Sequence, residues 1–166
     1  MRREEIVAAL TTLGERLHDK GIEGEIYVVG GAAIAMAFDA RRATRDVDAV
    51  FEPKQEIYAA ADEVGADLGL PPGWLNDGAK GFVAGPDDEA SAVLEVPGLR
   101  VLAASPRILL AMKVLAHRIG EDDEDVRLLA GHLGLTRADE VLAVAEQVYG
   151  DRLDAAARFF VEELFA

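Results

Sequence analysis

Apolar residues recur along this chain at two spacings, one typical of helices and one of strands. Ile6, Leu10, Leu13 and Leu17 recur every three or four residues and predict a helix over residues 3–20. Short apolar runs alternate with further helical segments after it. The first part of the chain is therefore predicted to contain helix 3–20, strand 25–29, helix 31–39, strand 46–51 and a helix from Pro53 to about Gly65.

The second part changes from strands to helices at residue 105. Residues 69–79 read as a loop and residues 80–84 as a short strand, while residues 92–96 and 99–103 flank a Pro-Gly pair typical of a hairpin turn. Ser105-Pro106 is a helix start signal. Helices are predicted over 106–119 and 122–133, from Thr136 onward, and over 152–165. The pattern indicates a small α/β lobe over residues 1–104 and a helical lobe over residues 105–166, with a single compact unit as the alternative.

Composition narrows the class of protein. Of the 166 residues, 51% are hydrophobic and 29% are charged, as in soluble globular domains. No apolar run could span a bilayer, the N-terminal arginines are followed by acids rather than by the apolar core of a signal peptide, and cysteine is absent. We therefore expect a cytoplasmic protein with no membrane partner, no disulfides and no thiolate metal site.

Charge is distributed unevenly along the chain. The formal net charge is −14, and residues 119–166 carry 4 Lys and Arg against 12 Asp and Glu, a net −8. Basic residues gather earlier, with Arg41, Arg42 and Arg45 close to two aspartates. This balance disfavours broad binding to a polyanion, and it suits a small anion such as a nucleoside triphosphate or a basic protein partner.

One segment, residues 28–51, combines residue types suited to phosphate chemistry. Asp46 and Asp48 are two positions apart on a predicted strand, so their side chains share a face and could hold Mg²⁺ or Mn²⁺. Gly30-Gly31 lets the backbone approach a ligand, and the N-terminus of the following helix favours phosphate. Arg42 and Arg45 are candidates to bind that phosphate. Each feature alone also suits a solvated surface, whereas their combination favours metal-dependent nucleotide chemistry.

The same residues carry a family resemblance. Gly30-Gly31 followed by Arg42-x-Thr44-x-Asp46-Val47-Asp48 resembles the pattern of the nucleotidyltransferase fold, the DNA polymerase beta-like superfamily. The chain is most similar to small bacterial members related to the AbiEii and MenT toxins, and the similarity runs from about residue 26 to about residue 135. The resemblance implies an α+β fold with a small mixed sheet flanked by helices and a helical C-terminal part.

The resemblance also implies roles for individual residues. The glycine pair would hold the triphosphate, Asp46 and Asp48 would bind Mg²⁺, and a third carboxylate would come from Asp77 or Glu95, with Asp77 the preferred candidate. Within the similar segment 105–125, Lys113 would support the phosphates as part of the catalytic set. Asp122 or Asp125 would orient that lysine or the nucleotide.

Two functions follow from these expectations. The first is a Mg²⁺-dependent nucleotidyltransferase that moves a nucleoside monophosphate from a triphosphate to a hydroxyl of a tRNA end, a protein or a small molecule. The toxin relatives suggest one half of a toxin–antitoxin pair, with an antitoxin protein as partner. The second is a degenerate, non-catalytic copy of the fold that binds a basic protein partner through its acidic helices.

Overall fold

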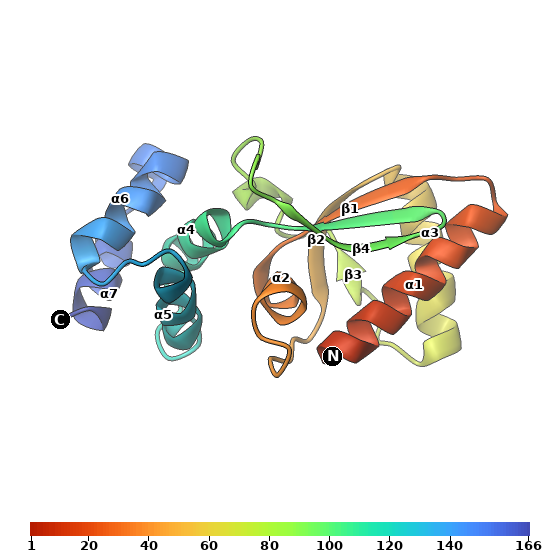
Figure 1. Ribbon diagram of the computed structural model, residues 1–166, viewed down its shortest axis with the longest axis horizontal. Helices are drawn as coiled ribbons and strands as arrows, with labels where there is room; N and C mark the ends of the chain where they lie inside the picture. Colours follow the sequence, from red (N-terminus) through yellow and green to blue (C-terminus); the bar gives the residue numbers. More distant parts are fainter. The chain divides into compact units, whose positions relative to one another are not determined.

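A five-stranded mixed sheet forms the centre of the N-terminal part of the chain (Figure 1). Its strand order is β3-β2-β1-β5-β4. β1 runs antiparallel to β2 and parallel to β5, β2 runs parallel to β3, and β4 runs antiparallel to β5. The strands are β1 (Gly24–Val28), β2 (Val47–Glu52), β3 (Leu75–Asn76), β4 (Ser91–Val96) and β5 (Leu99–Ala103).

The computed structural model describes all 166 residues and divides them into two compact units. The first unit, called the sheet unit here, comprises Met1–Val83 and Glu89–Ala104. The second, the helical unit, comprises Ala84–Asp88 and Ser105–Ala166. The sequence placed all residues before 105 in the first lobe. The structure differs at Ala84–Asp88, where the Asp87 carboxylate accepts a hydrogen bond of 2.7 Å from the backbone N–H of Ser105.

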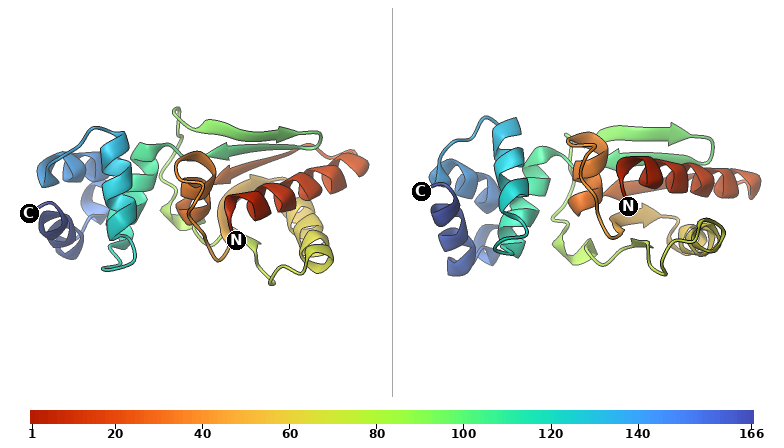
Figure 2. Two further views of the ribbon diagram at one scale, coloured as in Figure 1. Left: turned by 60° about the horizontal axis from the view of Figure 1, so that its bottom comes forward. Right: turned by 90° about the horizontal axis from the view of Figure 1, so that it is seen from below.

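Three helices belong to the sheet unit: α1 (Arg3–Asp19), α2 (Gly30–Ala37) and α3 (Lys54–Leu68). α1 contacts both α2 and α3 and packs on β5, and the views in Figure 2 show α1 and α2 on the same side of the sheet. Leu17 of α1, Ile57 of α3 and Leu99 of β5 converge on Gly24, whose missing side chain leaves room for them. The apolar core therefore lies on the helix-covered face of the sheet.

The opposite face of the sheet is more open. Val47, Ala49 and Phe51 of β2 point into the core, whereas the alternating residues Asp48 and Val50 are only partly buried. Side chains alternate between faces along a strand, so the partly buried residues share the second face. Asp48, one of the two aspartates proposed to bind a cation, is on this second face.

Two segments of the sheet unit differ from the expected elements. Residues 80–84 were predicted as a strand, but Lys80–Phe82 forms a single 3₁₀ turn (η1), so that prediction is wrong. The predicted loop over residues 69–79 contains the short strand β3. The hairpin is as predicted, and Gly98 in its turn has φ +83°, a left-handed conformation that glycine adopts without strain.

The helical unit is built around α4, which contacts each of the other helices of the unit. Ser105 caps α4, because its hydroxyl accepts a hydrogen bond of 3.3 Å from the backbone N–H of Ile108, and Pro106 occupies the first turn. No helix is both long and apolar enough to cross a membrane. The helices are α4 (Pro106–Ala116), α5 (Asp123–His132), α6 (Ala138–Tyr149), the 3₁₀ turn η2 (Gly150–Arg152) and α7 (Ala155–Leu164).

Candidate functional site

The chain bends sharply between β1 and α2 at the glycine pair. Gly30 has φ +63°, in the left-handed region where a side chain introduces strain. A Cβ atom on Gly30 would lie 3.6 Å from Oδ2 of Asp48, and one on Gly31 would lie 3.1 Å from Oγ1 of Thr44. The two glycines thus bring backbone next to polar groups of the segment that leads into β2. No side chain caps the N-terminus of α2, where backbone N–H groups point out of the helix.

Asp46 and Asp48 stand at the start of β2. Asp46 immediately precedes the strand and Asp48 is its second residue, and both are partly buried. Hydrogen bonds hold this end of the strand on both sides. On one side the Val29 N–H donates to the Asp48 carbonyl at 2.9 Å. On the other side the Val47 N–H donates to the Trp74 carbonyl at 2.6 Å. The acidic pair therefore lies beside the glycine bend on well-anchored backbone.

Asn76 is the polar residue that the structure adds to this pair. It is the register partner of Asp48 across β2 and β3, so the two side chains lie on the same face. Its Nδ2 group lies 3.3 Å from Oδ2 of Asp46 and donates a hydrogen bond to it. The sequence signal was present, since Asn76 follows two apolar residues in the WLND segment, but the resemblance favoured a carboxylate and therefore Asp77.

Asp77 belongs to a different cluster. Its carboxylate accepts a hydrogen bond of 2.6 Å from the Tyr58 hydroxyl and forms an ion pair with the Lys54 ammonium group, and both partners come from α3. The hydrogen bond from Lys54 lowers the pKa of Asp77 most, and the hydrogen bond from Tyr58 lowers it further, so that it lies below its ordinary value. Asp77 follows the end of β3 and its side chain contacts α3, whereas the side chain of Asn76 contacts Asp46.

Neither candidate for a third carboxylate completes a three-acid site. Glu95 is on β4, at the opposite edge of the sheet from β3, where its exposed side chain lies 3.2 Å from Arg100. No group of three or more Asp, Glu, His or Cys side chains in the chain is arranged to hold a metal ion. The structure brings Asp46, Asp48 and Asn76 together, and it does not bring Asp77 or Glu95 to them.

Basic residues surround the turn before β2. Arg45 is exposed and Arg42 is partly buried, while Arg41 is paired with Asp39 at 3.2 Å. A hydrogen bond from the backbone N–H of Arg41, followed by one from its side chain, lowers the pKa of Asp39. Of the two predicted phosphate ligands, Arg45 is more accessible than Arg42 because it is exposed.

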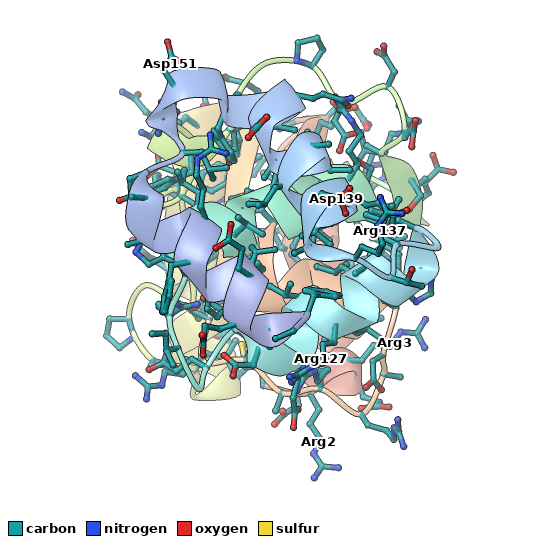
Figure 3. All side chains as sticks on the ribbon, turned by 90° about the vertical axis from the view of Figure 1, so that its left-hand side faces the viewer. Arg2, Arg3, Arg127, Arg137, Asp139 and Asp151 are labelled. Atoms are coloured by element: carbon teal, nitrogen blue, oxygen red, sulfur yellow. The ribbon has the colours of Figure 1, made fainter.

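The N-terminal residues hold this turn in place and add to its charge. The Thr44 N–H donates a hydrogen bond of 2.9 Å to the Met1 carbonyl, and Arg2 forms an antiparallel bridge with Ala43. The exposed Arg2, whose side chain projects away from the ribbon in Figure 3, therefore belongs to the same basic surface. Sequence reasoning missed Arg2 because the contact spans about forty positions of the chain.

The helical unit contains a buried ionic cluster. Lys113 Nζ lies 2.7 Å from Asp122 Oδ1 and 2.9 Å from Asp125 Oδ2. Arg118 also binds Asp122 through Nε at 3.0 Å and through its backbone N–H. Burial raises the pKa of Asp122, but the hydrogen bonds from Arg118 and Lys113 outweigh burial and bring its pKa below the ordinary value.

This cluster fixes the position of Lys113. Its side chain is 10% exposed, and two of the three donors of its ammonium group are directed to carboxylates. The resemblance implied that Asp122 or Asp125 orients Lys113, and the structure shows both in direct contact with it. A role of Lys113 in phosphate binding stays a prediction.

The residues at the start of β2 fit a small hard cation. Mg²⁺ prefers oxygen ligands and is commonly bound by one or two carboxylates, with water and substrate phosphates completing its octahedron. Asp46 and Asp48 provide such carboxylates on one face, and the glycine bend beside them lets phosphate oxygens approach. A third carboxylate is not required for this mode of binding.

The chain was compared with protein-family models, with curated proteins and with solved structures, and nothing matched it in any of the three comparisons.

Proposed function

We propose that the chain is a Mg²⁺-dependent nucleotidyltransferase. It would bind a nucleoside triphosphate and transfer the nucleoside monophosphate to an acceptor hydroxyl. The observation that supports this most is the placement of the Asp48 carboxylate against the left-handed bend at Gly30, with Asp46 two residues away on the same face. The family resemblance described above supports the same activity.

In this proposal different residues of the sheet unit bind the cation and the phosphates. Asp46 and Asp48 hold Mg²⁺, which when bound polarises the phosphate and offsets developing negative charge. Gly30 and Gly31 allow the polyphosphate to approach the N-terminus of α2, whose N–H groups and dipole favour anions. The exposed Arg45 stabilises phosphate charge from outside.

The reaction is a substitution at the α-phosphorus. The acceptor oxygen forms a bond to the α-phosphorus. The bond from the α-phosphorus to the oxygen that bridges it to the β-phosphorus breaks, and pyrophosphate leaves. The proton of the acceptor hydroxyl passes to a carboxylate or to water. The geometry supports this transfer through positioning and charge, as phosphoryl chemistry generally requires.

The acceptor is a tRNA end, a protein side chain or a small molecule. The net charge of −14 speaks against a large polyanionic acceptor held over a wide surface, whereas the basic turn could hold a short anionic segment. The resemblance to toxins adds the proposal that the chain acts in the cytoplasm of a bacterium and is paired with an antitoxin protein.

A second function is favoured by one observation, the lack of any group of three acidic or histidine side chains arranged around a metal. The chain would then be a non-catalytic copy of the fold that binds a basic protein. The two functions differ in whether a triphosphate binds, and they are separated by the same experiment.

That experiment is incubation of the protein with each α-labelled triphosphate, Mg²⁺, and cellular RNA or lysate protein in separate reactions. The nucleotidyltransferase transfers label to one fraction, and Asp46→Asn removes the transfer. Glu95→Gln is the matched control, because Glu95 is an exposed acid at the other edge of the sheet, and this variant retains the transfer. Absence of label in every fraction, together with no binding of triphosphate at millimolar concentration, supports the protein-binding function instead.

A further inference from the structure

The side-chain amide of Asn76 has a fixed orientation. The Gly78 N–H donates a hydrogen bond of 3.0 Å to Oδ1 of Asn76, so this atom must be the oxygen. The amide Nδ2 donates to the Gly73 carbonyl and to Oδ2 of Asp46, at 3.3 Å each. Every part of the amide is thus engaged, and reversing it would place an N–H against the N–H of Gly78.

The residues around Asn76 preserve this orientation. A Cβ atom on Gly78 would lie 2.9 Å from Oδ1 of Asn76, closer than real Cβ atoms approach, so a side chain at position 78 would displace this amide. Trp74, two residues earlier, is 2% exposed and its indole N–H donates a hydrogen bond of 2.9 Å to the Ala61 carbonyl. The backbone on both sides of Asn76 is therefore anchored.

Asn76 differs from its neighbour Asp77 in what it does to a carboxylate. Asp77 is neutralised by the Lys54 ammonium group, whereas Asp46 receives a hydrogen bond from a neutral amide. A neutral donor directs one carboxylate oxygen and leaves the negative charge in place. Asn76 binds Asp46 through Oδ2, and this contact restricts the rotation of the carboxylate.

We infer that Asn76 is a positioning residue of the metal site: it orients the Asp46 carboxylate for a divalent cation without neutralising it. The inference rests on the proposed function, since it concerns the cation that Asp46 and Asp48 would hold. Partners that orient metal ligands in this way contribute about 10-fold to 100-fold to metal affinity. Asn76 would therefore act through Asp46 and would not touch the nucleotide.

The test is a titration of the full chain with Mn²⁺ in the absence of nucleotide. Electron paramagnetic resonance distinguishes free from bound Mn²⁺ and so measures the affinity. Asn76→Ala should weaken Mn²⁺ binding by about 10-fold or more. In the Asp46→Asn background the same substitution should have no further effect, because its contribution passes through Asp46. Asp77→Asn is the control at the next position, and it should leave Mn²⁺ affinity unchanged.

Three results would overturn the inference: Mn²⁺ affinity unchanged in Asn76→Ala, an equal loss in the Asp46→Asn background, or no binding by the unaltered chain. Thermal unfolding shows whether each variant is folded, and Asn76→Ser replaces Asn76→Ala if the alanine variant is not. The labelling experiment judges the proposed function independently. Labelling by a chain whose Mn²⁺ affinity does not depend on Asn76 would reject the inference alone.

Discussion

Gly30 is the neighbour of Asp48 at the bend: a Cβ atom at position 30 would lie 3.6 Å from Oδ2 of Asp48. The distance is an ordinary van der Waals contact, so crowding does not prevent a side chain there. The φ of +63° at Gly30 does impose a cost, because residues with a Cβ adopt this conformation with strain. Backbone conformation, rather than space, therefore makes glycine necessary at the bend.

Gly30→Ala should lower the free energy of unfolding by about 1–2 kcal/mol through this backbone strain. Denaturation in urea measures the change. Gly81→Ala is the control, since Gly81 has a φ outside the left-handed region and nothing within 4 Å of the Cβ position, and it should leave stability unchanged. Equal stability of Gly30→Ala and the unaltered chain would show that the bend relaxes to accept a side chain.

Asn76→Asp should convert the two-carboxylate site into a three-carboxylate site. Without metal, the new charge faces Asp46 at the position of the present 3.3 Å hydrogen bond, so repulsion should lower the melting temperature. Adding Mn²⁺ should raise the melting temperature of this variant more than that of the unaltered chain, because ligand binding stabilises the folded state. A melting temperature insensitive to Mn²⁺ in both proteins would argue against any cation site at the start of β2.

The buried cluster of the helical unit should be a major source of its stability. Asp122→Ala removes the carboxylate shared by Lys113 and Arg118, and it should cost about 3 kcal/mol because it leaves a buried charge poorly compensated. Arg137→Ala breaks an exposed ion pair in the same unit, visible beside Asp139 in Figure 3, and should cost far less because water screens exposed charges. Urea denaturation measures the free energy of unfolding of both variants. A similar decrease in the two would show that the buried cluster stabilises the fold no more than an exposed ion pair does.

The same cluster predicts how stability depends on acid pH. The pKa of Asp122 is lower in the folded chain than in the unfolded chain, where an aspartate titrates at about 3.9. Its stabilising contribution is therefore complete above that value and is lost as pH falls through the folded pKa. The stability difference between the unaltered chain and Asp122→Asn should shrink below about pH 4. A difference that stays constant down to pH 3 would contradict this.

Local signals in the sequence predicted much of the fold. Ser105-Pro106 marked the start of α4, and Pro97-Gly98 marked the hairpin between β4 and β5, because capping and turn chemistry depend on adjacent residues. The two-residue strand β3 was missed, since its existence depends on pairing with the distant β2. The wrong strand over residues 80–84 has a similar cause: short apolar runs do not specify their own structure.

The site was predictable where its residues are close in sequence. Asp46, Asp48 and the glycine pair belong to one strand–helix–strand segment, and the structure places Asp48 beside Gly30. The contact between Asn76 and Asp46 was not anticipated, because it depends on the register of β3 against β2. The contribution of Arg2 depends on the long-range bridge to Ala43, which no local pattern indicates.

Titration of the full chain with each nucleoside triphosphate, with and without Mg²⁺, tests the central proposal most directly. Calorimetry should detect binding of at least one triphosphate that requires Mg²⁺ and is lost in both Asp46→Asn and Asp48→Asn, while Glu95→Gln binds normally. Binding that persists in the two aspartate variants, or no binding of any triphosphate by the unaltered folded chain, would contradict a cation-dependent nucleotide site at the start of β2.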